Sequence, residues 1–238
     1  MSPTILITGP VRSLSAFAQA ARDADWSVVE RPLLEIRDVE PQLDFEPGVA
    51  LERILITSRN AVRGLDRLAT DWLELRELPC SIVGATTADV LRQADFAIEG
   101  EPAASAERLA ERLASELPES STVLWPRGSV SDELAERLRS LGHTVLDPIV
   151  YRTETVDDAS PLPATDAVFL ASPSAVRAWG ALDREGSEAP FAVAIGPTTR
   201  AALESRKPGD VRDILSLARP DPKALSECLR DLAGRLDS

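Results

Sequence analysis

The sequence is poor in the residues that most often bind metals or form disulfides. It contains two cysteines, Cys80 and Cys228, and a single histidine, His143. The cysteines are far apart and belong to no paired motif, so we expect two reduced, buried thiols rather than a disulfide. Because there is no cluster of Cys and His residues, no metal site is expected. These absences favour a cytoplasmic protein that holds no metal.

The chain also lacks long apolar runs and basic clusters. No apolar stretch approaches the length of a membrane span, and Met1-Ser2-Pro3 leads straight into a predicted strand rather than into a signal peptide. The formal net charge is -13, and no cluster of Lys and Arg offsets it. We therefore predict a protein that binds neither membranes nor nucleic acids.

The common enzyme motifs are missing as well. There is no Walker loop and no G-x-G-x-x-G after a strand, which argues against nucleotide binding. His143 follows Gly142 at a predicted helix end, so we expect it at the surface rather than in a Ser-His-Asp set. The acidic pairs of the predicted helices are interpreted as solvated faces: Glu107 with Glu111, and Glu133 with Glu136. The sequence thus predicts no cofactor.

What the sequence does contain is an internal duplication. Residues 195–203 (IGPTTRAAL) have a counterpart in residues 83–91 (VGATTADVL). Residues 168–177 (VFLASPSAVR) have a counterpart in residues 54–63 (ILITSRNAVR) at nearly the same spacing. Two unrelated motifs that recur at one spacing indicate two similar halves, although the period far exceeds that of a solenoid.

Short apolar strands alternate with amphipathic helices along the chain. Residues 5–7 form an apolar run, and a stripe of apolar residues at helical spacing follows it. Hydroxyl residues stand where several predicted helices begin: Ser58, Ser105 and Ser172 are candidate N-caps, as is Thr86 or Thr87. This alternation predicts an α/β fold with parallel sheets flanked by helices.

Two stretches without periodicity, residues 37–50 and 151–164, are interpreted as interdomain linkers. Each follows a strand-helix-strand unit that cannot form a core alone. We therefore predict a discontinuous first domain, residues 1–36 plus 165–238, and a second domain of residues 51–150. A simple tandem cut near Glu119 is the alternative, but it would leave a linker inside each domain.

Four predicted turns are rich in hydroxyl and small residues: 57–60, 84–87, 172–174 and 196–199. In parallel sheets, ligands bind at the carboxyl ends of the strands, where helix N-termini present free amides. If the two domains face each other, these turns would line a shared cleft for an anionic ligand. Helix capping is the alternative role for each turn.

Tyr151 is the only tyrosine, and it lies where the last strand of the second domain enters a linker. A phenol can donate a proton near neutral pH. The other interpretation is that Tyr151 is an aromatic side chain that only packs at the hinge between the domains. The residue pattern alone leaves both interpretations open.

Taken together, several blocks resemble the uroporphyrinogen-III synthase family. They run along nearly the whole chain in the order and spacing of that family: residues 5–10, 32–34, 55–62, 83–88, 123–128, 150–153, 172–176 and 195–199, with Gly142. One block departs from the family pattern, because Thr8-Gly9-Pro10 stands where many relatives have Thr-Arg-Pro. Arg12 is the candidate substitute for the missing arginine.

The resemblance implies two similar α/β domains joined by a two-stranded connector, with the N-terminal piece folding with the C-terminal half. It also implies a reaction without metal or organic cofactor. Hydroxymethylbilane, a linear tetrapyrrole rich in carboxylates, would lose its hydroxyl and close to uroporphyrinogen III with the last ring inverted. Transient contact with hydroxymethylbilane synthase and a monomeric state are expected.

The resemblance also assigns roles to residues. Tyr151 matches the family tyrosine that is thought to help the hydroxyl depart. The residues expected to bind the substrate carboxylates are Arg12, Ser58, Asn60, Thr86, Thr87, Arg127, Gly128, Ser172, Ser174, Gly196, Thr198 and Thr199. Two other readings stay open: a non-catalytic tetrapyrrole-binding or regulatory module on the same fold, and a sensor similar to periplasmic binding proteins, which the expected lack of a signal peptide disfavours.

Overall fold

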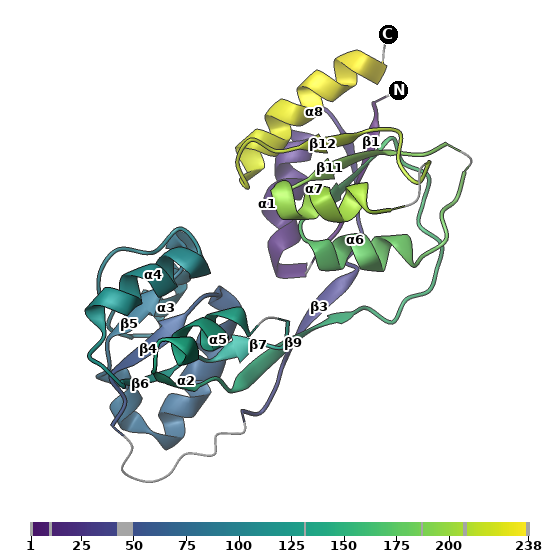
Figure 1. Ribbon diagram of the computed structural model, residues 1–238. Coiled ribbons are helices and arrows are strands. Elements are labelled where there is room, and N and C mark those ends of the chain that lie inside the picture. The colour runs from purple at the N-terminus through teal and green to yellow at the C-terminus, as the bar shows by residue number, and fades with distance from the viewer. Residues whose placement is uncertain are drawn as a thin grey trace. The chain divides into compact units, whose positions relative to one another are not determined.

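The computed structural model describes residues 2–9, 11–41, 50–130, 132–186, 188–206 and 209–236, and the side chains of residues 11–14 are outside this description. The chain divides into two compact units (Figure 1). The first consists of Met1–Glu35 with Glu154–Ser238, and the second of Ile36–Thr153. The layout predicted from the sequence divides the chain in the same order, and its boundaries stay predictions.

The first unit is built on a five-stranded parallel sheet in the order β12-β11-β10-β1-β2. Its strands are β1 (Thr4–Ile7), β2 (Ser27–Glu30), β10 (Ala167–Leu170), β11 (Phe191–Ala194) and β12 (Ile214–Ser216). The pair β1–β10 joins the N-terminal strand to the second half of the chain, because Ile5 pairs with Ala167. Neither segment therefore forms this sheet alone.

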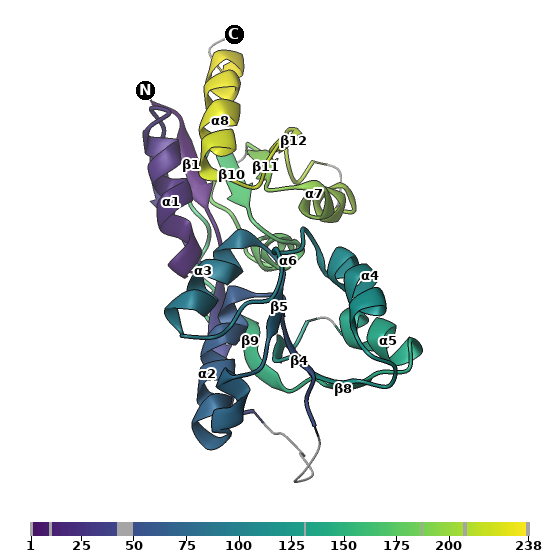
Figure 2. The same ribbon diagram turned by 90° about the vertical axis from the view of Figure 1, so that its left-hand side faces the viewer.

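Helices cover both faces of this sheet. Figure 2 shows α1 (Val11–Arg22) and α8 (Pro222–Leu236) side by side, and they pack on the face that carries Ile5 and Phe169. The opposite face carries Leu6 and packs against α6 (Pro173–Gly180) and α7 (Pro197–Glu204). Because neighbouring strand residues point to opposite faces, the inner strands β10 and β11 are apolar and buried throughout, as expected for a sheet that is covered on both sides.

The second unit repeats this arrangement on a four-stranded parallel sheet in the order β5-β4-β6-β8. Its strands are β4 (Arg53–Ile56), β5 (Cys80–Ile82), β6 (Thr122–Leu124) and β8 (Thr144–Leu146). One face packs against α2 (Val62–Asp71) and α3 (Ala85–Gln93), and the other against α4 (Ala106–Glu116) and α5 (Glu133–Ser140). Two 3₁₀ helices, η1 (Arg59–Ala61) and η2 (Leu73–Arg76), flank α2. The predicted α/β class with parallel sheets is confirmed.

A third, small sheet has the order β3-β9-β7 and includes the strands that run between the units. These strands are β3 (Leu34–Asp38), β7 (Arg127–Gly128) and β9 (Ile149–Thr155). The stretch 151–164 was interpreted as an interdomain linker, and its first residues form the end of β9. The strand is kept regular by its two neighbours, because a central strand has hydrogen-bond partners on both sides. Residues 42–49 of the other expected linker lie outside the described residues.

Three of the predicted helix caps are confirmed. The hydroxyl oxygens of Ser58, Ser105 and Ser172 accept hydrogen bonds from the amides of Asn60, Arg108 and Ala175 at 3.2, 3.3 and 3.1 Å. The predicted cap by Thr86 or Thr87 is wrong, because the N-cap of α3 is Gly84, which has no side chain to accept a bond. Both threonines lie in the first helical turn, where the backbone is already helical and no longer extended as at a cap.

The end of α5 corrects the placement of His143. Gly142 has a φ of 90° and ends the helix as predicted. The amide of Gly142 donates to the carbonyl of Arg139 at 3.0 Å, and that of His143 donates to Leu138 at 3.2 Å. These two hydrogen bonds end the helix and fold the chain back over its last turn. His143 is therefore 8% exposed rather than at the surface.

Cys80 and Cys228 are both free, and the expected burial is confirmed for Cys80, whereas Cys228 is only half-buried. Burial raises the pKa of the Cys80 thiol from 9.0 to about 12, although nearby Arg53 partly opposes this. We expect Cys80 to resist alkylation by iodoacetamide at pH 8 in the folded protein and to react in urea, because only a thiolate attacks the reagent. Mass spectrometry of the alkylated protein measures this.

Because the pKa of Cys80 is raised in the folded state, the free energy of unfolding should decrease at alkaline pH. Below pH 9 the thiol of Cys80 is protonated in both the folded and the unfolded state. Between pH 9 and 12 the unfolded chain releases this proton while the folded chain keeps it, so the free energy of unfolding decreases. Rapid alkylation of Cys80 under native conditions at pH 8 would contradict the burial that underlies both expectations.

Candidate functional site

In the second unit, the predicted site residues gather at one edge of the sheet. Ser58 and Asn60 follow β4, Thr86 follows β5, and Arg127 follows β6. These three strands are parallel, so their carboxyl ends meet at the same edge. The short helix η1 contacts both α3 and β7, which brings the three turns together.

The turn after β4 is held at this edge by two hydrogen bonds. The hydroxyl oxygen of Ser58 accepts the amide proton of Asn60, and both side chains are half-buried. The indole of Trp125, which follows β6, donates to the hydroxyl of Thr57 at 3.1 Å. Sequence reasoning missed Trp125, because only the fold places it beside residue 57.

The turn after β5 leaves the start of α3 without a side-chain cap. Gly84 is the N-cap and has a φ of 81°, a backbone conformation that favours glycine. The first amides of a helix have no partner within the helix, so this end offers hydrogen-bond donors and a positive partial charge. Thr86 is exposed beside them, whereas Thr87 is 6% exposed and faces the core.

Arg127 is held by an ion-pair network rather than directed into solvent. Its Nε lies 2.8 Å from Asp147 Oδ2, and Nη2 of Arg139 lies 2.6 Å from Asp147 Oδ1. The Arg127 side chain is 14% exposed, and its guanidinium lies 5.6 Å from the centre of the Trp125 ring. The two arginines and one aspartate leave one net positive charge next to the candidate site. Asp147 gave no sequence signal for this role.

Tyr151 lies in β9, opposite Gly128 of β7, and is half-buried. A Cβ atom placed on Gly128 would lie 2.5 Å from Cζ of Tyr151 and 2.8 Å from its hydroxyl oxygen. The ring therefore occupies the space that a side chain at position 128 would need. The phenol hydroxyl is thus located next to β7, which follows the carboxyl end of β6.

The first unit has an equivalent edge. Ser172 and Ser174 follow β10, and Gly196 and Thr198 follow β11. Ser172 caps α6, whereas the N-cap of α7 is Gly196, which offers no side-chain bond. Thr198 is exposed beside the uncapped amides of α7.

The remaining predicted site residues of the first unit are Thr199, Ser174 and Arg12. Thr199 is 1% exposed, like its counterpart Thr87 in the second unit. The hydroxyl oxygen of Ser174 accepts a hydrogen bond from Arg177 Nη2 at 3.0 Å. Arg12 lies in the first turn of α1, and its side chain lies outside the described residues.

The sequence also matches a known protein family. The family model described as uroporphyrinogen-III synthase HemD matches residues 15–225. The chain belongs to the uroporphyrinogen-III synthase family. The family places the chain among proteins of porphyrin and heme biosynthesis. A search of curated proteins finds no matching sequence.

Solved structures of uroporphyrinogen-III synthases share the fold. The crystal structure of the enzyme from Helicobacter pylori superposes with a TM-score of 0.67 at 18% identity, covering 98% of this chain and 100% of that chain. A mutant enzyme from the extremely thermophilic bacterium Thermus thermophilus gives a TM-score of 0.60 at 16% identity, covering 98% of this chain and 99% of that chain. At these identities the likeness shows the fold alone.

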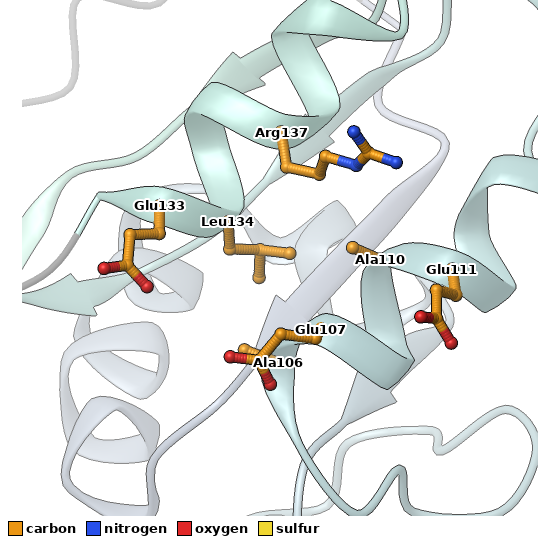
Figure 3. Close-up of a pocket in the computed structure, with 7 residues that line it drawn as sticks. All are labelled: Ala106, Glu107, Ala110, Glu111, Glu133, Leu134 and Arg137. Carbon is orange, nitrogen blue, oxygen red and sulfur yellow. The ribbon is translucent and has the colours of Figure 1, made fainter. Parts of the chain in front are cut away.

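One groove of the second unit lies apart from the residues that the uroporphyrinogen-III synthase resemblance assigns. It has a volume of about 330 Å³ and runs between α4 and α5, with Leu134 and Ala110 among its apolar lining residues. Figure 3 shows the carboxylates of Glu107 and Glu133 rising from the first turns of these helices. The Ser105 side chain and the local backbone hold the pKa of Glu107 below its usual value. A groove with charged carboxylates at its rim does not suit a polyanion.

Within the described ranges, no group of three or more His, Cys, Asp or Glu residues could hold a metal ion. None of the helices that the structure describes is long and apolar enough to cross a membrane.

Proposed function

We propose that the protein is a uroporphyrinogen-III synthase that closes hydroxymethylbilane to uroporphyrinogen III, with inversion of the last pyrrole ring and loss of water. The observation that carries the proposal is the position of Tyr151. Its hydroxyl lies 2.8 Å from the Cβ position of Gly128 in β7, and β7 contacts η1, which in turn contacts α3. Membership of the family supplies the reaction.

The substrate carries many carboxylates, and the two sheet edges offer matching donors. In the second unit these are the first amides of α3, the hydroxyl of Thr86 and the turn at Ser58. In the first unit they are the first amides of α7 with Thr198. Helix N-termini bind anions without lysine or arginine, because their amides and the helix dipole both favour negative charge. Such donors support binding of a polyanion by a protein with a formal net charge of -13.

The chemistry requires a proton for the departing hydroxyl. We assign this role to the phenol of Tyr151, which would donate a hydrogen bond or proton so that the hydroxyl leaves as water. The substituted carbon of the last ring then attacks the methylene carbon that has lost the hydroxyl, and ring inversion proceeds through a spiro intermediate. Left alone, the substrate closes without inversion. The main task of the protein is therefore to hold a flexible reactant in one conformation.

The direct test is a coupled assay. Hydroxymethylbilane is generated in situ by hydroxymethylbilane synthase, and the oxidised products are separated by chromatography into isomers I and III. With the protein present we expect isomer III to dominate, whereas heat-denatured protein should leave isomer I. An unchanged isomer ratio together with measurable substrate binding would replace the proposal by a non-catalytic tetrapyrrole-binding module.

A further inference from the structure

Gly128 has a close neighbour that explains why no side chain is present there. Its ideal Cβ position lies 2.5 Å from Cζ, 2.7 Å from Cε2 and 2.8 Å from the hydroxyl oxygen of Tyr151. Its φ is not in the left-handed region, so an L-residue could adopt the backbone conformation. Only the contact with the tyrosine ring therefore opposes a side chain at this position.

The pairing of β7 with β9 directs the ring of Tyr151 toward Gly128. Arg127 pairs with Ile149 and Gly128 with Tyr151, so the register shifts and β9 has one extra residue, Val150, opposite β7. Such bulges change the direction in which the next side chain points, and they occur often beside active sites. Val150 is fully buried against α2, where a Cβ on Gly64 would lie 2.2 Å from Val150 Cβ.

The strand β7 is itself held in place. Arg127 binds Asp147 through Nε at 2.8 Å, and its Nη1 donates to the carbonyl of Gly128 at 3.2 Å. Arg139 holds the second oxygen of Asp147 at 2.6 Å. Because Asp147 lies just before β9, this network joins the segments that carry Gly128 and Tyr151. Arg127 therefore has a structural role, because it holds β7 in place beside β9.

We propose that Gly128 is a positioning residue that fixes the hydroxyl of Tyr151, and that its absent side chain, rather than a contact with substrate, is what the reaction requires. The inference rests on the proposed role of Tyr151. It differs from the sequence-based assignment of Gly128 as a substrate-binding residue. The atoms that a Cβ would meet are at the far end of a flexible side chain, so alanine at position 128 should displace the ring and leave the fold intact.

The test compares Gly128→Ala with Gly234→Ala in the full chain. Gly234 is the matched control, because it lies in α8 and nothing is within 4 Å of its Cβ position. Tyr151 is the only tyrosine, so ¹³C-tyrosine labelling gives one set of ring signals that reports its environment without any assay of activity. We expect these signals to shift in Gly128→Ala and to stay unchanged in Gly234→Ala, with similar unfolding midpoints.

The kinetic expectation is a fall in kcat of about 10- to 100-fold for Gly128→Ala with little change in KM, because a displaced catalytic group loses its alignment. In a Tyr151→Phe background the same substitution should change kcat by less than about 2-fold, since the hydroxyl is already absent. Unshifted tyrosine signals in Gly128→Ala would overturn the inference. So would equal losses of kcat in both backgrounds, which indicate direct substrate contact.

The outcomes separate this inference from the proposed function. If Tyr151→Phe retains full activity, the proposed role of the phenol fails, whereas the ring signals of Gly128→Ala still report whether Gly128 fixes the ring. If Tyr151→Phe is impaired but Gly128→Ala has normal signals and normal kcat, the role of the phenol stands and the positioning role of Gly128 is wrong.

Discussion

Replacing Tyr151 with phenylalanine should lower kcat for the formation of uroporphyrinogen III by about 100-fold, the lower end of what a positioned proton donor contributes. The change removes one hydroxyl group and keeps the ring. Phenylalanine preserves the ring packing opposite Gly128 and against the core of the second unit, so stability should change little. KM should stay nearly constant, because the carboxylates that anchor the substrate bind elsewhere.

The coupled assay measures this directly as the initial rate of isomer III and its ratio to isomer I. As kcat falls, spontaneous closure should raise the share of isomer I. The unfolding midpoint of the variant serves as the control for intact structure. A variant with the wild-type rate and isomer ratio would remove Tyr151 from the mechanism and leave it as a packed aromatic residue of β9.

Gly64→Ala is expected to lower the free energy of unfolding of the second unit by about 2 kcal/mol, a typical cost of overpacking. A helical glycine replaced by alanine normally gains about 1 kcal/mol. At Gly64, however, the new methyl group would lie 2.2 Å from Cβ and 2.6 Å from Cγ2 of Val150. These atoms are next to the backbone of β9 and cannot rotate away, so either the strand or α2 must move. The overpacking outweighs the gain in helix propensity.

Urea unfolding followed by circular dichroism measures this change, and hydrogen exchange at the amides of α2 and β9 locates it. Gly234→Ala is again the matched control, because it introduces the same methyl group into a helix where space is open. The control should be as stable as the wild type or slightly more stable. If Gly64→Ala matched the control, the close packing of α2 on β9 would be wrong.

The fold follows from local patterns that the sequence displays openly. Short apolar runs ended by Gly or hydroxyl residues became the buried parallel strands, since a strand covered on both faces needs no polar positions. Ser58 and Ser172 were predicted as caps because a short hydroxyl side chain before an apolar periodic segment bonds to the helix amides directly. These are interactions between neighbours in sequence.

The features that could not be predicted depend on contacts between distant residues. The contact between Gly128 and Tyr151 requires a two-residue strand and a bulge in its partner. The pairing of Arg127 with Asp147 likewise depends on how β7 and β8 end. Hydropathy does not distinguish Thr86 from Thr87, yet the second threonine of the motif points into the core in both units, as Thr87 and Thr199 show.

The pairing of β1 with β10 has a consequence for synthesis on the ribosome. The amide of Thr4 binds Asp166, 162 residues later in the chain. Domains generally fold as they emerge, with N-terminal ones first. In this protein residues 36–153 can complete their own core while β1 is paired only with β2 and still lacks its second neighbour, β10. The sheet of the first unit is therefore completed only after residues 167–170 have been translated, later than the sheet of the second unit.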